Sequence, residues 1–335
     1  MASPSSPAKK SKLSSTSSGS AGSRLSDITT DLFRTTFTSL DEPGAAARLR
    51  TDVDRAVGMG MRPGVFAKVG DSNLASYNSL YGLGCRTPVW AGFERFQPTV
   101  DRYRQIELPP GGGRPDHVLP ADQRKPWNSF SRSSAATYSG LIGPHLLWPT
   151  SEFTDGPLGW HPDPDSLPGE SMTASEIRLT RPLFVFLNVG TNGNGYGLGT
   201  DETADQVIPV LDEIRRLGPV PLLFTIPPQL DEDGSGTKWA FARDVNVRIR
   251  EIARDRDVLL FDQWLALSDE RLDNHGMVSF DGGLYDGLHL ETPGGFRSEG
   301  ALERSVDFSE PNLRYGANLR NLLLLNVLRR LDESL

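Results

Sequence analysis

The run Leu183-Phe-Val-Phe-Leu-Asn-Val189 decides the fold class of this chain. It is strand-sized, almost wholly apolar and bounded by Pro182 and Gly190, as is typical of a strand buried on both faces. Comparable runs recur at 65–69, 221–226 and 258–262. Helical patterns are expected at about 201–216, 238–254 and 313–331. Because strands and helices alternate, we predict an α/β fold with a parallel sheet that is covered by helices on both sides.

The N-terminal part of the chain has a different composition. Residues 1–25 are rich in Ser, Ala, Gly and Lys and lack an apolar segment, so we expect a disordered leader there and a single domain over 26–335. The leader fits equally a linker left after removal of an export signal and a native cytoplasmic tail, so the compartment stays open. Ser39-Leu-Asp-Glu42 before Pro43 has the form of a capped helix start, and this helix is expected to end by Gly58.

Residues 85–175 interrupt the alternation. This region is dense in Pro, Gly and Trp and shows no sustained periodicity. We expect loops laid over the scaffold rather than a second core. Long loops in a compact domain are often functional, so this insertion is the place to look for substrate-binding walls.

Composition and charge exclude several classes of protein. The 335 residues are 37% hydrophobic and carry a formal net charge of −8, with a pI near 5.3. A nucleic-acid surface needs a basic patch, so no nucleic-acid partner is expected. Cys85 is the single cysteine, which excludes an intrachain disulfide and a cysteine-based zinc site. No run approaches the roughly 20 apolar residues of a membrane-spanning helix, so no transmembrane segment is expected.

Polar motifs follow the predicted strands or lie beyond the last one. They are Gly70-Asp71-Ser72-Asn73, Gly190-Thr191-Asn192 and Asp286-Gly287-Leu288-His289. In open α/β sheets, ligands bind at the carboxyl ends of the strands, so we expect these motifs to meet there. A serine, an amide, and a carboxylate with an imidazole are the parts of an acyl-transfer site.

The spacing of Asp286 and His289 suits a catalytic base. Residues three apart on a turn can face each other, so the carboxylate can hold Nδ1–H of the imidazole while Nε2 faces outward. That imidazole can then take the proton of a serine hydroxyl, which is a poor nucleophile without a base. We therefore expect Ser72, Asp286 and His289 to be the catalytic residues.

These three motifs, in this order over about residues 60–331, resemble the signature blocks of the SGNH/GDSL hydrolase family. The resemblance implies a flavodoxin-like, three-layer α/β/α fold. It also implies that Ser72 is the nucleophile, that Asp286 and His289 complete the triad, and that Asn192 donates to the oxyanion. Two backbone N–H groups, of Ser72 and of a residue in a second block, would supply the other oxyanion donors.

The second block departs from the family pattern. Its best counterpart is Phe130-Ser-Arg-Ser-Ser-Ala-Ala-Thr137, where Ser134 stands at the place of the usual glycine. A backbone N–H survives that exchange unless the site needs positive φ. Gly84 and Gly140 remain alternatives. A second departure is Gly193, where many family members have Asp directly after the Asn.

The function implied by the resemblance is that of a serine esterase acting through an acyl-enzyme. The polar insertion with its tryptophans favours short-acyl or O-acetyl esters of carbohydrate-like substrates, and the triad needs no metal or organic cofactor. The alternative is a non-catalytic carbohydrate- or protein-binding module on the same fold. Acyl and alcohol specificity, oligomeric state and compartment are not readable from the residues.

Each motif also has a structural interpretation. Ser72 alone fits a helix N-cap, Asn192 a turn residue, and Asp286 with His289 a structural hydrogen bond. His275 is the alternative candidate for the catalytic base. The remaining histidines are expected to be surface or packing residues: His117, His145 and His161. Four tryptophans in the insertion fit either sugar stacking or loop anchoring, the latter being the commoner role: Trp90, Trp127, Trp148 and Trp160.

A dinucleotide-binding loop is the remaining rival for residues 189–199. This glycine-rich segment follows a strand and precedes a helix. Its register is wrong, because the third glycine of the fingerprint falls on Leu198 or Thr200. No Walker-type motif occurs either.

Overall fold

The computed structural model describes part of the chain, which includes the predicted strands. The described residues are 25–76, 78–112, 125–134, 136–137, 140–149, 163–231, 233–271, 287–295 and 300–335. The strands are β1 (Arg62–Gly70), β2 (Pro182–Asn188), β3 (Val220–Phe224) and β4 (Leu259–Phe261).

The helices, in chain order, are α1 (Leu25–Thr35), α2 (Ala45–Gly58), α3 (Ser72–Ala75), α4 (Tyr81–Cys85), α5 (Gln97–Arg104), α6 (Met172–Thr180), α7 (Thr200–Asp205), α8 (Val207–Leu217), α9 (Thr237–Asp255), α10 (Gln263–Leu267), α11 (Ala301–Arg304) and α12 (Gly316–Glu333). Single turns of 3-10 helix are η1 (Glu94–Phe96), η4 (Gly143–Leu147), η6 (Gly193–Tyr196) and η8 (Asn312–Arg314).

The strands form one parallel four-stranded sheet in the order β1-β2-β3-β4. Every residue of β2 is buried, which explains why its sequence is continuously apolar. Aromatic rings run across one face: Phe66 stacks on Phe186 at 4.5 Å, and Phe224 contacts both Phe186 and Phe261. This packing makes the sheet the centre of the hydrophobic core.

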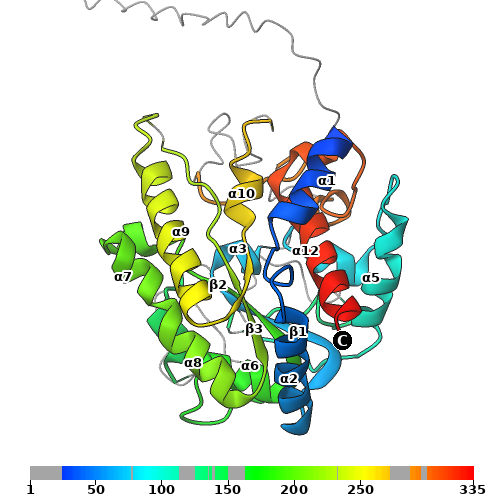
Figure 1. Ribbon diagram of the computed structural model, residues 1–335, viewed down its shortest axis with the longest axis vertical. Coiled ribbons are helices and arrows are strands. Elements are labelled where there is room, and N and C mark those ends of the chain that lie inside the picture. The colour runs from blue at the N-terminus through cyan, green and yellow to red at the C-terminus, as the bar shows by residue number, and fades with distance from the viewer. Residues whose placement is uncertain are drawn as a thin grey trace, which may run out of the picture.

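Helices cover both faces of the sheet. Helices α6, α8 and α9 contact β1, β3 and β4 in turn, α2 contacts β2 and β3, and α5 contacts β1 and is joined by α12. Figure 1 shows α7, α8 and α9 on one side of the strands and α1, α5 and α12 on the other. The α/β class with a parallel sheet flanked by helices is therefore confirmed. No described helix is both long enough and apolar enough to cross a membrane.

The edge of the sheet beside β1 is occupied by the second-block segment. Gly70 N–H donates to Ala136 O at 2.8 Å, and Gly70 bridges Thr137 in parallel. In the flavodoxin-like order 2-1-3-4-5, a strand lies at this position. Here the described residues form a single bridge, so β1 lies at the edge of the regular sheet.

Several boundaries differ from the sequence prediction. The helix expected over 201–216 is two helices, α7 and α8, because Pro209 has no N–H for the carbonyl of Asp205 and its ring crowds that carbonyl. The capped start at Ser39 is wrong. Helix α2 begins after Gly44 without a side-chain cap, and the Ser39 hydroxyl accepts a hydrogen bond from Leu260 N of β4 instead.

Two further predictions needed correction. The region 85–175 contains α5 and the first residues of α6, which short, irregular apolar spacing had hidden. Strand β1 begins at Arg62 instead of after the Pro63-Gly64 breaker, with a register irregularity between Arg62 and Phe66 that accommodates the proline. The strand still ends at Gly70, so the position of Ser72 is unaffected.

Helix α12 runs through the interior and carries polar side chains with it. The leucines predicted to pack, among them Leu322, Leu325 and Leu328, are buried. Asn321, on the same helix, is also buried and donates to Asn78 O at 2.9 Å while accepting from Leu80 N. This helix therefore holds the segment that follows Ser72 by hydrogen bonds as well as by apolar packing.

Candidate active site

Ser72 lies at the carboxyl end of β1, where the strand turns into α3. Gly70 closes the strand with φ of 157°, and a Cβ at this position would lie 2.0 Å from Asn188 O of β2. Only glycine lets the two backbones approach this closely. Ser72 then begins α3 with its side chain largely buried, 5% exposed. The local structure thus presents a serine at the edge of the sheet, as the motif predicted.

Asp71 ties the Ser72 turn to the loop after β2. Its Oδ1 accepts from Asn73 N at 3.0 Å as the N-cap of α3, and its Oδ2 accepts from Thr191 N at 3.2 Å. The carboxylate is completely buried. One aspartate therefore fixes the relative positions of the first two motifs.

Thr191 extends this connection to the loop after β3. Its hydroxyl accepts from Asn73 Nδ2 at 3.2 Å, and its carbonyl accepts from Gln229 Nε2 at 3.0 Å. Three strand ends are thus joined through one residue. Sequence reasoning assigned no role to Thr191 or Gln229; the signal was their place directly after β2 and shortly after β3.

His289 reaches the same edge of the sheet from the far end of the chain. Leu230 N donates to Gly287 O at 2.9 Å, and Asn78 Nδ2 donates to Leu290 O at 2.8 Å. These bonds hold the segment that carries His289 between the loop after β3 and the chain beyond α3. His289 is buried, 8% exposed, and close enough to Asp71 to favour the ionised form of that carboxylate.

The expected hydrogen bond between Ser72 and His289 is not formed. Among the hydrogen bonds of the described residues, none joins the Ser72 hydroxyl to His289. Such contacts are often long in a free site and shorten with substrate bound. Asp286, the predicted third member, lies outside the described residues, as does His275, the alternative candidate for the base.

The buried Asp71 carboxyl is expected to make stability depend on pH. Burial raises the pKa of this carboxyl above its ordinary value of 3.8, and hydrogen bonds from Asn73 and Thr191 and the nearby His289 act in the opposite direction. Between pH 3.8 and the raised pKa, the native carboxyl keeps a proton that the unfolded chain has lost, so its contribution to stability falls as pH rises through this window.

Asp71→Asn removes that pH dependence. Wild type is expected to lose stability relative to the variant as the pH rises from 4 to 8. The free energy of unfolding of the variant minus that of wild type should therefore be larger at pH 8 than at pH 4. Urea unfolding at the two pH values measures the shift. A shift in the opposite direction would show that ionisation of Asp71 stabilises the fold.

Asn192 lies in the turn between β2 and α7. Its Nδ2 donates to Leu141 O at 2.9 Å, and the side chain is half-buried. An amide nitrogen has two N–H groups, so one is left for a ligand. The neighbouring Gly193 is explained by packing, because a Cβ there would lie 2.2 Å from Thr203 Oγ1 of α7. The departure from the family pattern at Gly193 therefore has a steric cause.

The three candidates for the remaining oxyanion donor differ in their surroundings. Ser134 N–H donates to Thr137 Oγ1 at 3.2 Å within its own turn. Gly84 is enclosed, since a Cβ there would lie 2.6 Å from Ser131. Gly140 is half-buried and precedes Leu141, whose carbonyl binds Asn192. Of the three, Gly140 is thus the one directly beside the Asn192 side chain.

A buried ion cluster fixes the second-block segment. Arg132 Nη2 lies 2.8 Å from Glu176 Oε2 and 3.3 Å from Asp163 Oδ2, and the three side chains are at most 3% exposed. Two carboxylates raise the pKa of Arg132 against the effect of burial. Movement of Arg132 away from the two carboxylates would leave uncompensated charges in the interior, which is strongly unfavourable. The cluster therefore holds residues 130–134 in place.

Arg320 of α12 lies under the Ser72 turn. Its Nη1 donates to Asn73 O at 2.7 Å, and the side chain is 1% exposed. Its Nε and Nη2 have no acceptor among the described residues. Burial lowers the pKa of Arg320 to about 9, and the charge of Asp71 opposes this. A buried cation thus supports the carbonyl of the residue after Ser72 and faces the charge of Asp71.

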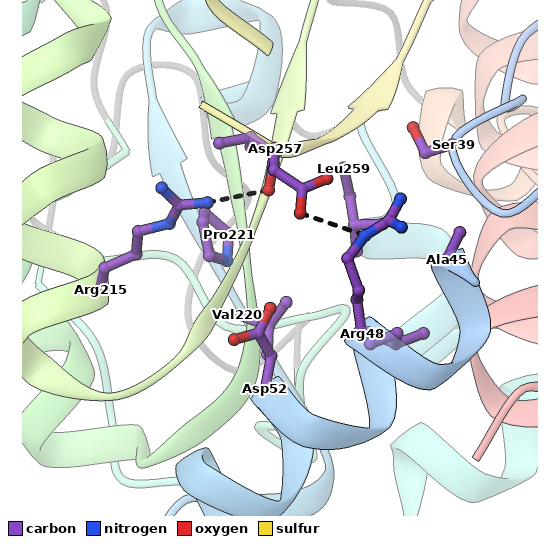
Figure 2. A pocket seen from close by; sticks show the side chains of 11 residues that line it. Ser39, Ala45, Arg48, Asp52, Arg215, Val220, Pro221, Asp257 and Leu259 are labelled. Carbon is purple, nitrogen blue, oxygen red and sulfur yellow. Dashed lines mark hydrogen bonds and ion pairs between the residues drawn. The ribbon is translucent and has the colours of Figure 1, made fainter. Parts of the chain in front are cut away.

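A small, partly open cavity lies at the opposite edge of the sheet and is not a candidate. Figure 2 shows it at the amino ends of β3 and β4, where Asp257 pairs with Arg48 at 3.2 Å and its carbonyl accepts from Arg215 at 2.9 Å. Its volume is about 40 Å³, far below the roughly 300–1,000 Å³ of small-molecule sites. Its charges neutralise one another, so it is a structural feature.

No group of three or more His, Cys, Asp or Glu side chains that could hold a metal ion occurs in the described part of the chain. The groups gathered at the carboxyl edge are a hydroxyl, an imidazole and amide donors. They are suited to attack on a carbonyl and to stabilisation of the oxyanion that results.

Comparison with known proteins gave matches among solved structures. A GDSL-like lipase from Bacteroides thetaiotaomicron is 10% identical, with a TM-score of 0.42, over 85% of this chain and 98% of its own. A carbohydrate esterase family 3 protein from Talaromyces cellulolyticus is 13% identical, with a TM-score of 0.43, over 79% and 98%. Est24, a carbohydrate acetylesterase from Sinorhizobium meliloti, is 12% identical, with a TM-score of 0.33, over 72% and 95%.

Protein-family models and curated protein sequences gave no match. Several of the matched structures are described as GDSL proteins, which is the family that the sequence motifs resemble. With TM-scores below 0.5 for these structures, the likeness carries no argument about activity. The function proposed below therefore rests on the residues of this chain.

Proposed function

We propose that the protein is a serine esterase that hydrolyses carboxylic esters through an acyl-enzyme. The observation that supports the proposal is the link between the segments that carry Ser72, Asn192 and His289. Thr191, beside Asn192, bonds to Asp71 and Asn73 on either side of Ser72, and His289 lies within electrostatic reach of Asp71. Asp286 is proposed as the partner of His289 on the spacing of the motif alone.

In the proposed reaction, the Ser72 hydroxyl attacks the ester carbonyl while His289 takes its proton. The imidazolium then protonates the leaving alcohol, and water activated by the same imidazole releases the acid. The buried Asp71 carboxylate, when ionised, further stabilises the imidazolium because it lies within electrostatic reach of His289. No step requires a metal or an organic cofactor.

The oxyanion would be held by three N–H groups. The Ser72 N–H begins α3 and belongs to the first turn of a helix, whose N–H groups have no partner within the helix. Asn192 offers its second amide hydrogen. For the third donor we favour Gly140 over Ser134, because the Ser134 N–H already binds Thr137 and Gly140 lies beside Asn192.

Arg320 is proposed as a positioning residue for the nucleophile. Arg320→Met removes the bond to Asn73 O and is expected to lower kcat about 10- to 100-fold with little change in KM, since a displacement of about 1 Å at the reacting atoms has an effect of this size. Arg320→Lys, which keeps the charge and one donor, should recover most of the rate. Equal losses in both variants, or a loss confined to KM, would contradict the positioning role.

An exposed aromatic group beside Asn192 supports a carbohydrate-like substrate. His145 packs edge-on against Trp148 at 4.5 Å and against Tyr196 at 5.8 Å, and the Tyr196 hydroxyl donates to Gly140 O at 3.0 Å. Trp148 and Tyr196 are 43% and 49% exposed. Of the other insertion tryptophans, Trp127 is buried, Trp90 stacks on Phe308, and Trp160 is not described.

The substrate proposal predicts a selective effect of Trp148→Ala. We expect kcat/KM to fall about tenfold on acetylated xylo-oligosaccharide, because a stacking surface for the sugar is lost, and to stay within about twofold on p-nitrophenyl acetate. Wild-type rates on p-nitrophenyl esters from acetyl to palmitoyl should be highest for acetyl. Equal losses on both acetyl substrates would contradict the sugar platform, and a preference for palmitoyl would contradict the short-acyl assignment.

A further inference from the structure

A second region of interest lies on the side of the molecule where α1 meets α12. Figure 1 shows these helices side by side, and their residues are in contact. A cavity of about 530 Å³ opens between them and η1, within the range of small-molecule sites. Arg320, under the Ser72 turn, is nine residues before Arg329 of the cavity wall, which is about 14 Å along the helix axis.

The wall of this cavity is rich in guanidinium groups. Four arginines face two carboxylates there, although the whole chain carries a net charge of −8; the six are Arg34, Arg95, Arg329, Arg330, Asp41 and Glu333. Both carboxylates are already engaged, Asp41 by Arg330 and Glu333 by Arg329 at 2.8 Å, and Arg34 pairs with Asp31 at 3.6 Å. An excess of positive charge therefore remains at the cavity.

Arg95 is the centre of that excess. It has no hydrogen bond or ion pair with any residue that the structure describes. Burial and the like charge of Arg329 both lower its pKa. The Nε of Arg329 is itself buried without an acceptor in the described residues. Two guanidinium groups thus lie close together. Arg95 is exposed and faces solvent, the Nε of Arg329 lacks an acceptor, and a bound oxyanion would accept from both.

Aromatic rings orient these groups. The Arg95 Cζ lies 5.1 Å from the ring centre of Phe33 and 5.0 Å from that of Phe96, and the Arg329 Cζ lies 5.8 Å from Phe96. A guanidinium held by its face on an aromatic ring keeps its N–H edge available for two parallel bonds to an oxyanion.

An apolar pocket adjoins the cavity. It has a volume of about 280 Å³ and shares Thr30 and Arg95 with the cavity wall. Its larger apolar side chains come from distant parts of the chain: Leu25, Phe93, Phe308 and Leu313. The exposed Glu310 is the one carboxylate on its rim. An alkyl chain bonded to an oxyanion at Arg95 would enter this pocket directly.

We infer that the two pockets form a binding site for an anionic amphiphile, with an oxyanion head on Arg95 and Arg329 and an alkyl tail in the apolar pocket. Two sources have this chemistry: a fatty carboxylate and a lipid phosphate. The site is separate from the proposed ester-hydrolysing site, so it stands whether or not the protein is an esterase.

Calorimetric titration of the full chain, with each probe below its micellar concentration, tests the site. We expect octyl phosphate or octanoate to bind. The Arg95→Gln substitution should raise the Kd of the tighter-binding anion at least about tenfold. Arg243→Gln, which removes an exposed arginine of α9 and changes the net charge equally, should bind as wild type does. Ser72→Ala should also bind as wild type does.

Further probes test the contributions of the head group and of the tail, and they distinguish the two sources of the ligand. Octyl glucoside, with the same tail and a neutral head, and inorganic phosphate, without a tail, should each bind at least about tenfold more weakly than the tighter octyl anion. Tighter binding of octanoate assigns a fatty carboxylate, and tighter binding of octyl phosphate a lipid phosphate. The inference is overturned if neither octyl phosphate nor octanoate binds, or if Arg95→Gln binds the tighter of these anions as well as wild type does. It is also overturned if octyl glucoside or inorganic phosphate binds wild type as tightly as that anion does.

Discussion

Replacing Ser72 by alanine is expected to lower kcat/KM for p-nitrophenyl acetate by about 10⁴-fold or more. The hydroxyl is the proposed nucleophile, and the residual rate would come only from oxyanion stabilisation and binding. The variant should remain folded, because the Ser72 hydroxyl lies at the edge of the sheet and the hydrogen bonds of the turn are made by backbone groups and by Asp71.

Far-UV circular dichroism and thermal unfolding of Ser72→Ala provide the necessary control. A midpoint within about 2 °C of wild type, together with the lost rate, assigns the effect to chemistry. If the variant hydrolyses the ester at more than about a tenth of the wild-type rate, Ser72 is not the nucleophile, and an alternative such as general-base catalysis without an acyl-enzyme must be considered.

The second large effect is expected for Asn192→Ala. Removal of one oxyanion donor from a side-chain amide typically lowers kcat about 10²- to 10³-fold, because the lost bond is stronger in the transition state than in the bound substrate. KM should change little. The same substitution also removes the bond to Leu141 O, so part of the loss would reflect movement of the Gly140 segment.

Asn194→Ala is the matched control, since Asn194 lies two residues further along the same turn and is exposed. It should keep at least half of the wild-type kcat. Equal losses in Asn192→Ala and Asn194→Ala would indicate a general disturbance of the turn. An unchanged kcat in Asn192→Ala would remove Asn192 from the oxyanion site.

The sheet could be predicted from the sequence because its strands are buried on both faces. Such strands are continuous apolar runs bounded by glycine or proline, and β2 and β3 appear within a residue or two of their expected positions. Errors arose where backbone chemistry or tertiary contacts overrode periodicity. Pro209 divided one predicted helix, and Ser39 bonds to β4 instead of capping α2.

The positions of the candidate residues could be predicted in part. Ser72 and Asn192 were expected at one edge of the sheet because the ends of parallel strands meet there, and both follow strand ends; their catalytic roles stay predictions. Asp286 lies outside the described residues and stays a prediction. Arg320 could not be found, because an arginine in a leucine-rich helix is expected to face solvent unless its buried partner is known.

Thr191 illustrates a different limit. A threonine between glycine and asparagine gives no signal of its own, and its importance comes from contacts with Asp71, Asn73 and Gln229. The contacts with Asp71 and Asn73 cross 120 and 118 residues, and the contact with Gln229 crosses 38. Polar contacts of this kind follow from the folded topology. They carry no local pattern that periodicity or motif spacing can detect.

The most direct measurement of the central claim is covalent labelling by a fluorophosphonate, followed by mass spectrometry of the peptides. A serine activated by a neighbouring base reacts with this reagent, whereas an ordinary buried hydroxyl does not. We predict one adduct per chain, on Ser72, lost in Ser72→Ala and strongly reduced in His289→Ala. Folded wild-type protein that takes up no label, or takes it up on another serine, would contradict the assignment of Ser72 as an activated nucleophile.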